Sequence, residues 1–141
     1  MTKRFFPVIL LSSICVFSPV TFANENPLSQ ALNENVSVTG QMTTEKFQKL
    51  LQQGFKSVIV NRPDQEAGNM TSASTLRNLA EQAKLSLIYQ PVSSGQITQQ
   101  DVREFSKYYN SLPKPILLVC KSGSRSKLLF NQAQSLGLIN E

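Results

Sequence analysis

The residues best suited to chemistry lie in one short segment near the end of the chain, Cys120-Lys121-Ser122-Gly123-Ser124-Arg125-Ser126. An apolar run precedes this segment and an amphipathic stretch follows it, which predicts a buried strand, a tight loop and the start of a helix. Backbone N–H groups and the helix dipole favour an anion at such a place, and they also lower the pKa of a thiol. Gly123 lets the backbone approach a ligand closely, and Arg125 adds a forked cation that can hold an oxyanion. The segment therefore predicts a nucleophilic Cys120 in an anion-binding loop.

Each residue of this segment also has a simpler explanation. Cys120 could be a core cysteine after a hydrophobic strand, and Arg125 could be a surface arginine paired with a carboxylate. The Ser126 hydroxyl could donate to the thiolate or merely start the helix, and Lys121 could add positive potential at the rim or simply be solvated. With the loop residues between them, the candidate substrate-binding set is Lys121, Ser122, Gly123, Ser124, Ser126 and Arg62.

A second segment, Asn61-Arg62-Pro63-Asp64, supplies the best carboxylate for proton donation. Asp64 follows a predicted buried strand, and the competing explanation is a turn residue after proline. Arg62 could be a second contact for the anion, or it could brace Asp64. Glu66 and Tyr89 receive no role from the sequence.

The composition narrows the possible chemistry. The chain has 141 residues, 14 basic and 9 acidic side chains and no histidine, and its two cysteines are Cys15 and Cys120. The lack of histidine excludes Ser-His-Asp and Cys-His mechanisms from this chain and removes the commonest metal ligand. We therefore expect no metal and no cofactor. A small anionic or phosphorylated substrate fits the mild positive charge, whereas the absence of basic runs argues against nucleic acid.

The N-terminus predicts a cleaved secretory signal at residues 1–23. Lys3 and Arg4 precede an apolar stretch, and Thr21-Phe22-Ala23 provides small residues for cleavage. A membrane anchor is the alternative, but the stretch is short and contains prolines. Cleavage would leave no membrane anchor, a periplasmic or secreted protein, and Cys120 as the single thiol. We expect residues 24–35 to be a flexible leader and residues 36–141 to form one domain.

Strands and helices are expected to alternate through that domain. Short apolar runs predict strands at residues 36–38, 58–60, 85–89 and 116–119. Helices begin at Thr43 or Thr44, near Leu76, at Thr98 with Asp101 at capping-box spacing, and after Gly123. This order predicts an α/β fold with a mostly parallel central sheet flanked by helices on both faces. The loops 61–68, 91–95 and 120–125 then meet at the carboxyl ends of the strands, where ligands bind in such sheets.

Several stretches in this order resemble the bacterial "beta-lactamase hydrolase-like protein, phosphatase-like domain" family. They are Val38-Thr39-Gly40-Gln41, residues 54–64, Tyr89-Gln90-Pro91-Val92, Ile97-Thr98 and the Cys120 loop. That family is similar in fold to dual-specificity phosphatases, and some of its members are labelled as candidate sulfurtransferases. The resemblance implies a nucleophile at Cys120 and an oxyanion-binding arginine at Arg125.

The sequence departs from the phosphatase pattern in three ways. Val119 stands where such enzymes usually have histidine, and four residues rather than five separate Cys120 from Arg125. The loop 91–95, where their general-acid aspartate lies, has no carboxylate. A spacing of four is also common in rhodanese-type sulfurtransferases.

These observations predict an exported, cysteine-dependent hydrolase of the phosphatase type. Two alternatives stay open. One is a sulfurtransferase that forms a persulfide on Cys120, and the other is an anion-binding module without catalysis. The sequence gives no indication of the oligomeric state.

Overall fold

Five strands and four helices fold around the segments identified above. The computed structural model describes residues 3–5, 7, 15–16 and 27–140. Within them the elements are β1 (Gln30–Asn33), β2 (Val36–Thr39), α1 (Thr44–Leu51), β3 (Ser57–Val60), α2 (Ala73–Gln82), β4 (Ser86–Tyr89), α3 (Gln99–Ser111), β5 (Ile116–Val119) and α4 (Ser124–Ser135).

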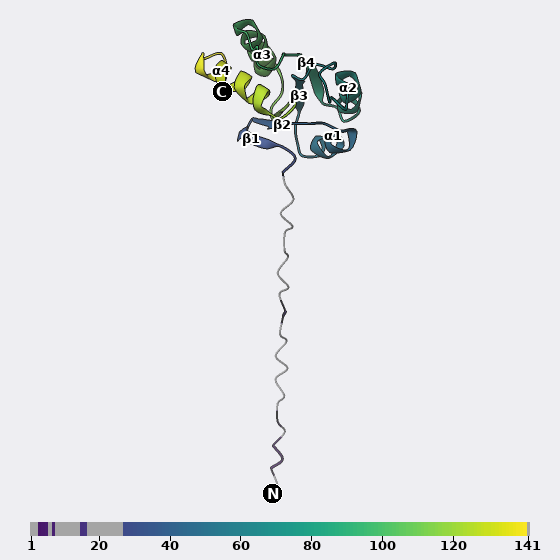
Figure 1. Ribbon diagram of the computed structural model, residues 1–141. Coiled ribbons are helices and arrows are strands. Elements are labelled where there is room, and N and C mark those ends of the chain that lie inside the picture. Colours follow the sequence, from purple (N-terminus) through teal and green to yellow (C-terminus); the bar gives the residue numbers. More distant parts are fainter. Residues whose placement is uncertain (1–2, 6, 8–14, 17–26, 141) are drawn as a thin grey trace.

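The strands form one sheet in the order β1-β2-β5-β3-β4. β1 is antiparallel to β2, and the other neighbours are parallel, with Leu118 of β5 opposite Val38 of β2 and Ile59 of β3. Helices α1 and α2 cover one face of the sheet, and α3 and α4 cover the other (Figure 1). The predicted α/β fold with a mostly parallel sheet is confirmed.

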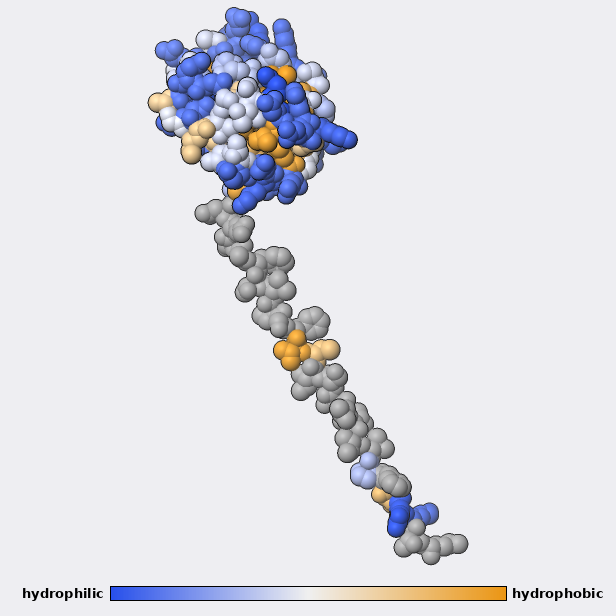
Figure 2. All heavy atoms as spheres, turned by 90° about the vertical axis from the view of Figure 1, so that its right-hand side faces the viewer, coloured by the Kyte–Doolittle hydropathy of each residue, from blue (hydrophilic) through white to orange (hydrophobic). Residues whose placement is uncertain are grey.

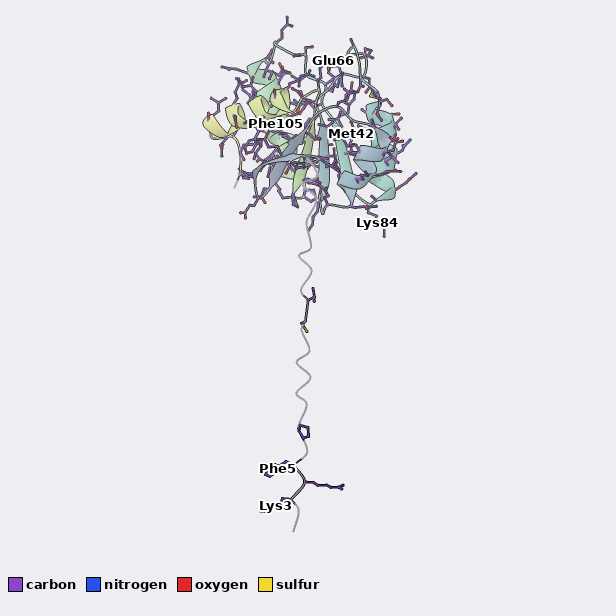
Figure 3. All side chains as sticks on the ribbon, turned by 60° about the horizontal axis from the view of Figure 1, so that its bottom comes forward. Lys3, Phe5, Met42, Glu66, Lys84 and Phe105 are labelled. Atoms are coloured by element: carbon purple, nitrogen blue, oxygen red, sulfur yellow. The ribbon has the colours of Figure 1, made fainter. Side chains whose placement is uncertain are left out.

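β5 lies in the middle of the sheet and is buried on both faces. All four of its residues are buried, as expected for a continuous apolar strand between two helical layers. Leu118 packs into the core beneath α3 and α4, and Leu117 packs into the core beneath α1 and α2. In Figure 3, Phe105 and Met42 mark these two cores on opposite sides of the sheet. The strand that carries Cys120 at its end is therefore held from both sides.

The predicted helix starts are confirmed by their caps. Thr43 accepts a hydrogen bond from the N–H of Lys46, and Thr98 forms the expected capping box with Asp101. α4 differs, because it begins after Gly123 in the left-handed conformation without a side-chain cap. Side chains of the Cys120 loop take the place of such a cap, because the N–H of Ser124 donates to the Ser122 hydroxyl, at 3.5 Å, and the N–H of Ser126 donates to the Cys120 sulfur.

The prediction of a flexible leader at residues 24–35 is wrong for its second half. Residues 30–33 form β1, an edge strand, and the Asn33 side chain accepts from the N–H groups of Asn35 and Val36 to close the turn into β2. The Thr39 hydroxyl also donates to the carbonyl oxygen of Leu28, at 2.7 Å. A four-residue, mostly exposed strand has too little apolar alternation to be recognised before its partner is known. The domain therefore includes β1.

The predicted signal segment lies mostly outside the described residues, which include only 3–5, 7 and 15–16 of it. In the part of the chain that the structure covers, no helix has the length and apolar character needed to cross a membrane. On the side where α1 and α2 lie, the surface is mainly hydrophilic with small apolar patches (Figure 2).

Candidate active site

Cys120 lies directly after β5, at the carboxyl edge of the sheet. Its backbone N–H donates to the carbonyl oxygen of Thr39, at 3.2 Å, and the residue is only 1% exposed. Its Sγ accepts a hydrogen bond from the N–H of Gly123, at 3.0 Å. Gly123 has a φ of 90°, so the loop folds its N–H groups back toward the sulfur in a conformation that favours glycine. The sequence-predicted loop and its amide donors are present as expected.

Two opposing effects set the acidity of the Cys120 thiol. Burial on its own raises its pKa, because it disfavours the charged thiolate. Hydrogen bonds from the N–H and hydroxyl of Ser126 and from the N–H groups of Ser122 and Gly123 favour the thiolate more strongly. The pKa of Cys120 therefore lies below that of an ordinary thiol, which suits a nucleophile.

The segment after β2 is hydrogen-bonded to the Cys120 loop. The N–H of Gln41 donates to the carbonyl oxygen of Lys121, at 2.9 Å, and Gly40 forms a bridge with Ser122. A Cβ placed on Gly40 would lie 2.8 Å from the Lys121 oxygen, so only glycine allows this approach. Neighbouring residues could not predict this contact with the Cys120 loop, because it joins residues about eighty positions apart.

Arg125 is the last residue of the loop 120–125, called the sulfur loop below, and its buried guanidinium joins this loop to the other two predicted rim loops. Its Nη1 donates to the carbonyl oxygens of Val92 and Asn61, at 3.0 and 3.4 Å, and its Nη2 donates to Glu66 Oε1 at 2.6 Å. Its Nε is buried and has no hydrogen-bond partner among the described residues. A buried N–H donor without an acceptor is costly, and an anion in the loop would satisfy it.

Glu66, one of two residues that received no role from the sequence, forms ion pairs with both buried arginines. One oxygen binds Arg125, and the other accepts from Arg62 Nε at 2.7 Å. The Glu66 carboxylate thus compensates the charges of two buried guanidinium groups, and its bond to Arg125 helps to fix the position of that side chain. Figure 3 shows Glu66 at the end of the sheet opposite Lys84, which places it at the rim where the strands end.

Arg62 supports Glu66 rather than either of the predicted partners. Its three guanidinium nitrogens bind Glu66, the Gln41 side-chain oxygen and the carbonyl oxygen of Ala67. None of these bonds involves Asp64, and Arg62 is not among the residues that line the cavity beside Cys120. Arg62, which was expected to contact the anion, therefore links Gln41 to Glu66, and Glu66 in turn binds Arg125.

Ser126 is fully buried at the first turn of α4. Its hydroxyl donates to Asn61 Oδ1, at 2.8 Å, and it lies close enough to the Cys120 sulfur to turn this one proton toward the thiolate. The Asn61 amide donates in turn to the carbonyl oxygen of Gln90, at 3.2 Å. A buried network therefore orients the hydroxyl next to the thiol.

Asp64 lies at the start of α2 and not at the sulfur loop. Its Oδ1 accepts from the N–H of Ala73, at 2.8 Å, and its own N–H donates to the Tyr89 hydroxyl. Satisfying a free N–H at a helix start is an ordinary task for aspartate. The predicted proton-donor role thus finds no support in the geometry.

A cavity of about 420 Å³ opens beside Cys120. Lys121, Ser122, Ser124 and Arg125 line it around the sulfur, and residues of α4 and of the loop before α3 extend it. Among the described residues that line the cavity, none carries a carboxylate. The arrangement can hold an oxyanion against a thiolate nucleophile, while it offers no carboxylic acid to a departing group.

Sequence comparison matches residues 29–137 to the family model "Beta-lactamase hydrolase-like protein, phosphatase-like domain". A beta-lactamase hydrolase-like protein of Xylella fastidiosa is 30% identical over 99 residues, which are 70% of this chain and 23% of that protein. One from Agrobacterium fabrum is 31% identical over 105 residues, 74% of this chain and 24% of that protein. The chain spans about a quarter of the length of these curated relatives.

Solved structures give a consistent result. A candidate phosphatase of Neisseria meningitidis is 28% identical, with a TM-score of 0.68 over 74% of this chain and 75% of that one. The core catalytic domain of the PP-IP phosphatase SIW14 of S. cerevisiae is 18% identical, with a TM-score of 0.62 over 78% and 66% of the two chains. At that identity the second likeness concerns the fold alone. The chain therefore has a phosphatase-like fold.

Proposed function

Because the chain belongs to the beta-lactamase hydrolase-like protein, phosphatase-like domain family, we propose that it is a cysteine-dependent phosphatase with Cys120 as nucleophile. One observation carries the proposal. A thiol of lowered pKa and a buried arginine, whose Nε has no partner among the described residues, line the same cavity. Nucleophile, amide donors and cation are thus arranged around one position that suits a phosphoryl group.

The reaction has two steps. The Cys120 thiolate attacks phosphorus, an S–P bond forms, and the ester P–O bond breaks with its electron pair leaving on the organic oxygen. Water then attacks phosphorus, the S–P bond breaks, and the thiolate and inorganic phosphate are released. One proton of that water ends on the organic oxygen. Arg125 Nε–H and the amides of Ser122 and Gly123 stabilise the phosphoryl oxygens in both steps.

The lining of the cavity determines which substrate to assay first. Without a carboxylic acid nearby, the leaving oxygen departs as an anion, and loss of a general acid slows reactions of poor leaving groups by about 10²–10⁴. Aryl phosphates release stable anions and are therefore the proper test. We expect the purified, reduced protein to hydrolyse an aryl phosphate and Cys120→Ser to abolish this activity. Equal turnover by Cys120→Ser would exclude the proposal.

A sulfurtransferase is the second candidate, and the four-residue spacing from Cys120 to Arg125 favours it. The thiolate would take the outer sulfur of thiosulfate, forming a persulfide and releasing sulfite, and cyanide would then remove that sulfur as thiocyanate. No proton donor is needed. Thiocyanate production that requires Cys120, without aryl phosphate turnover, would favour this reaction. Turnover by neither route would leave an anion-binding module.

We also propose that the protein is exported. The motivation is the segment Lys3 to Ala23, with its basic start, apolar middle and small-residue cleavage site. The test is N-terminal sequencing of the protein recovered from the periplasm of a bacterial host. A chain that begins at Asn24 is expected, whereas a chain that still carries residues 3–23 in the cytoplasm would argue against export.

A further inference from the structure

The cavity beside Cys120 is longer than a phosphoryl group requires. It reaches from the sulfur loop along α4 to Gln132, seven residues beyond Arg125. At a rise of about 1.5 Å per residue, this corresponds to about 10 Å of helix. The remaining length is available for the organic part of a substrate, and a volume of about 420 Å³ is in the range of small-molecule sites.

The outer part of the cavity has an apolar wall. Leu128 projects from α4 and is 47% exposed, and Ile97 contributes a second apolar side chain from the loop before α3. An exposed leucine at the mouth of a cavity gains stabilisation when a ligand covers it. Gln132 ends this wall with an uncharged amide that can donate or accept a hydrogen bond.

The charge of the cavity suits one anionic group. Among the described residues that line it, only Lys121 and Arg125 are cationic, and both belong to the sulfur loop. The charge of Arg125 is moreover offset by Glu66, at 2.6 Å. A second phosphate at the outer end would meet Leu128, Ile97 and Gln132 and would lose its hydration without gaining a cation.

We propose that this site acts on monoesters of phosphate whose organic part is apolar, uncharged and about the size of a fused ring, seated against Leu128 and Ile97. The proposal rests on the phosphatase function proposed above. It assigns specificity to Leu128, which takes no part in the chemistry and packs in neither core.

The test compares two aryl phosphates whose phenols have similar acidity, phenyl phosphate and 2-naphthyl phosphate. For the unmodified protein we expect a higher kcat/KM with the naphthyl ester, because its second ring covers more of the apolar wall. Leu128→Gln should reduce the naphthyl-to-phenyl ratio of kcat/KM by about three- to tenfold, in line with the value of a small apolar contact in a binding pocket. Leu136→Gln is the matched control, since Leu136 is also an exposed leucine, 57% exposed, at the end of α4 and away from the cavity lining.

A binding measurement separates this inference from the reaction itself. Calorimetry on Cys120→Ser should show tighter binding of 2-naphthyl phosphate than of phenyl phosphate, and inositol hexakisphosphate should bind more weakly than either. If the ligands bind in this order but the unmodified protein does not hydrolyse aryl phosphates, the phosphatase reaction is excluded and the proposed ligand class is retained. Two results would exclude the proposed ligand class without excluding the phosphatase reaction. One is the same naphthyl-to-phenyl ratio of kcat/KM in Leu128→Gln and Leu136→Gln. The other is tighter binding of inositol hexakisphosphate than of 2-naphthyl phosphate.

Discussion

At Cys120, hydrogen bonds to the sulfur outweigh burial. A buried thiol without donors has a raised pKa and is inert, whereas this sulfur faces N–H groups of its own loop and the Ser126 hydroxyl. Arg125, whose Nε–H has no acceptor within the described part of the chain, lines the same cavity as Cys120. The fold holds these donors around the sulfur before a substrate arrives, which favours the stabilisation of negative charge at this place.

The lowered pKa of Cys120 can be tested by alkylation with iodoacetamide as a function of pH. We expect the rate for the Cys120 peptide, quantified by mass spectrometry, to rise with a midpoint below that of the urea-unfolded chain. Ser126→Ala removes one donor to the thiolate and should move this midpoint to higher pH. Ser106→Ala is the control, because Ser106 is a buried serine whose hydroxyl donates within α3. A midpoint that is the same in the folded and unfolded chains would contradict the lowered pKa.

Glu66 is expected to act through the position of Arg125. Glu66→Gln keeps the shape of the side chain but removes the charge that compensates Arg62 and Arg125. We expect kcat/KM for an aryl phosphate to fall at least about tenfold and stability to fall by about 1–3 kcal/mol, since two buried charges lose their partner. The alkylation midpoint of Cys120 should not rise, because losing a nearby negative charge does not disfavour a thiolate.

Glu104→Gln provides the comparison for that experiment. Glu104 is a carboxylate on α3 that accepts a hydrogen bond from Tyr108 in an exposed position. Its substitution should leave both kcat/KM and stability nearly unchanged. Unchanged kinetics in Glu66→Gln would show that Arg125 does not depend on its ion pair.

At the scale of elements, the loop after β3 supports both α2 and the active site. Its carboxylates have separate tasks, because Asp64 satisfies the N–H of Ala73 at the start of α2 and Glu66 binds the two arginines. The loop is therefore held through Asp64 to the start of α2 and through Glu66 to Arg125.

Substitution of Asp64 distinguishes a capping residue from a general acid. We expect Asp64→Ala to lower the free energy of unfolding by about 1 kcal/mol, as for other residues that satisfy helix N-termini. kcat for a poor leaving group, such as an alkyl phosphate, should change little. Asp101→Ala at the capping box of α3 should behave in the same way. A fall in kcat of about 10²–10⁴ in Asp64→Ala alone would restore the acid role.

Local signals made most elements predictable. Thr98 and Asp101 are three residues apart, and β5 is a continuous apolar run followed by the cysteine, so each could be identified from a few neighbouring residues. Glu66 could not, because its contact with Arg125 joins residues 59 positions apart and depends on how the loops meet. The contact of Asp64 with the N–H of Ala73 could not be predicted from neighbouring residues either, since it depends on where α2 begins relative to the loop.

At the scale of the whole molecule, the sulfur loop is joined to the N-terminal edge of the sheet through Thr39. Its carbonyl oxygen accepts from the N–H of Cys120, and its hydroxyl donates to Leu28 just before β1. β1 also covers the outer edge of β2, which would otherwise present unpaired backbone groups. We therefore expect β1 to be required for a stable site, although it contributes no residue to the cavity.

Two shortened chains test this role of β1. A chain that begins at residue 27 retains β1, and a chain that begins at residue 35 removes it together with the Leu28 contact. We expect the second chain to unfold at lower urea concentration, with a loss of about 2 kcal/mol from the buried apolar surface and hydrogen bonds that it forfeits. It should also self-associate, because the edge of β2 becomes available to other chains. Equal urea midpoints and equal aryl phosphate turnover in the two chains would mean that the domain begins at β2. A loss of stability with unchanged turnover per folded molecule would instead separate the edge strand from the geometry of the sulfur loop.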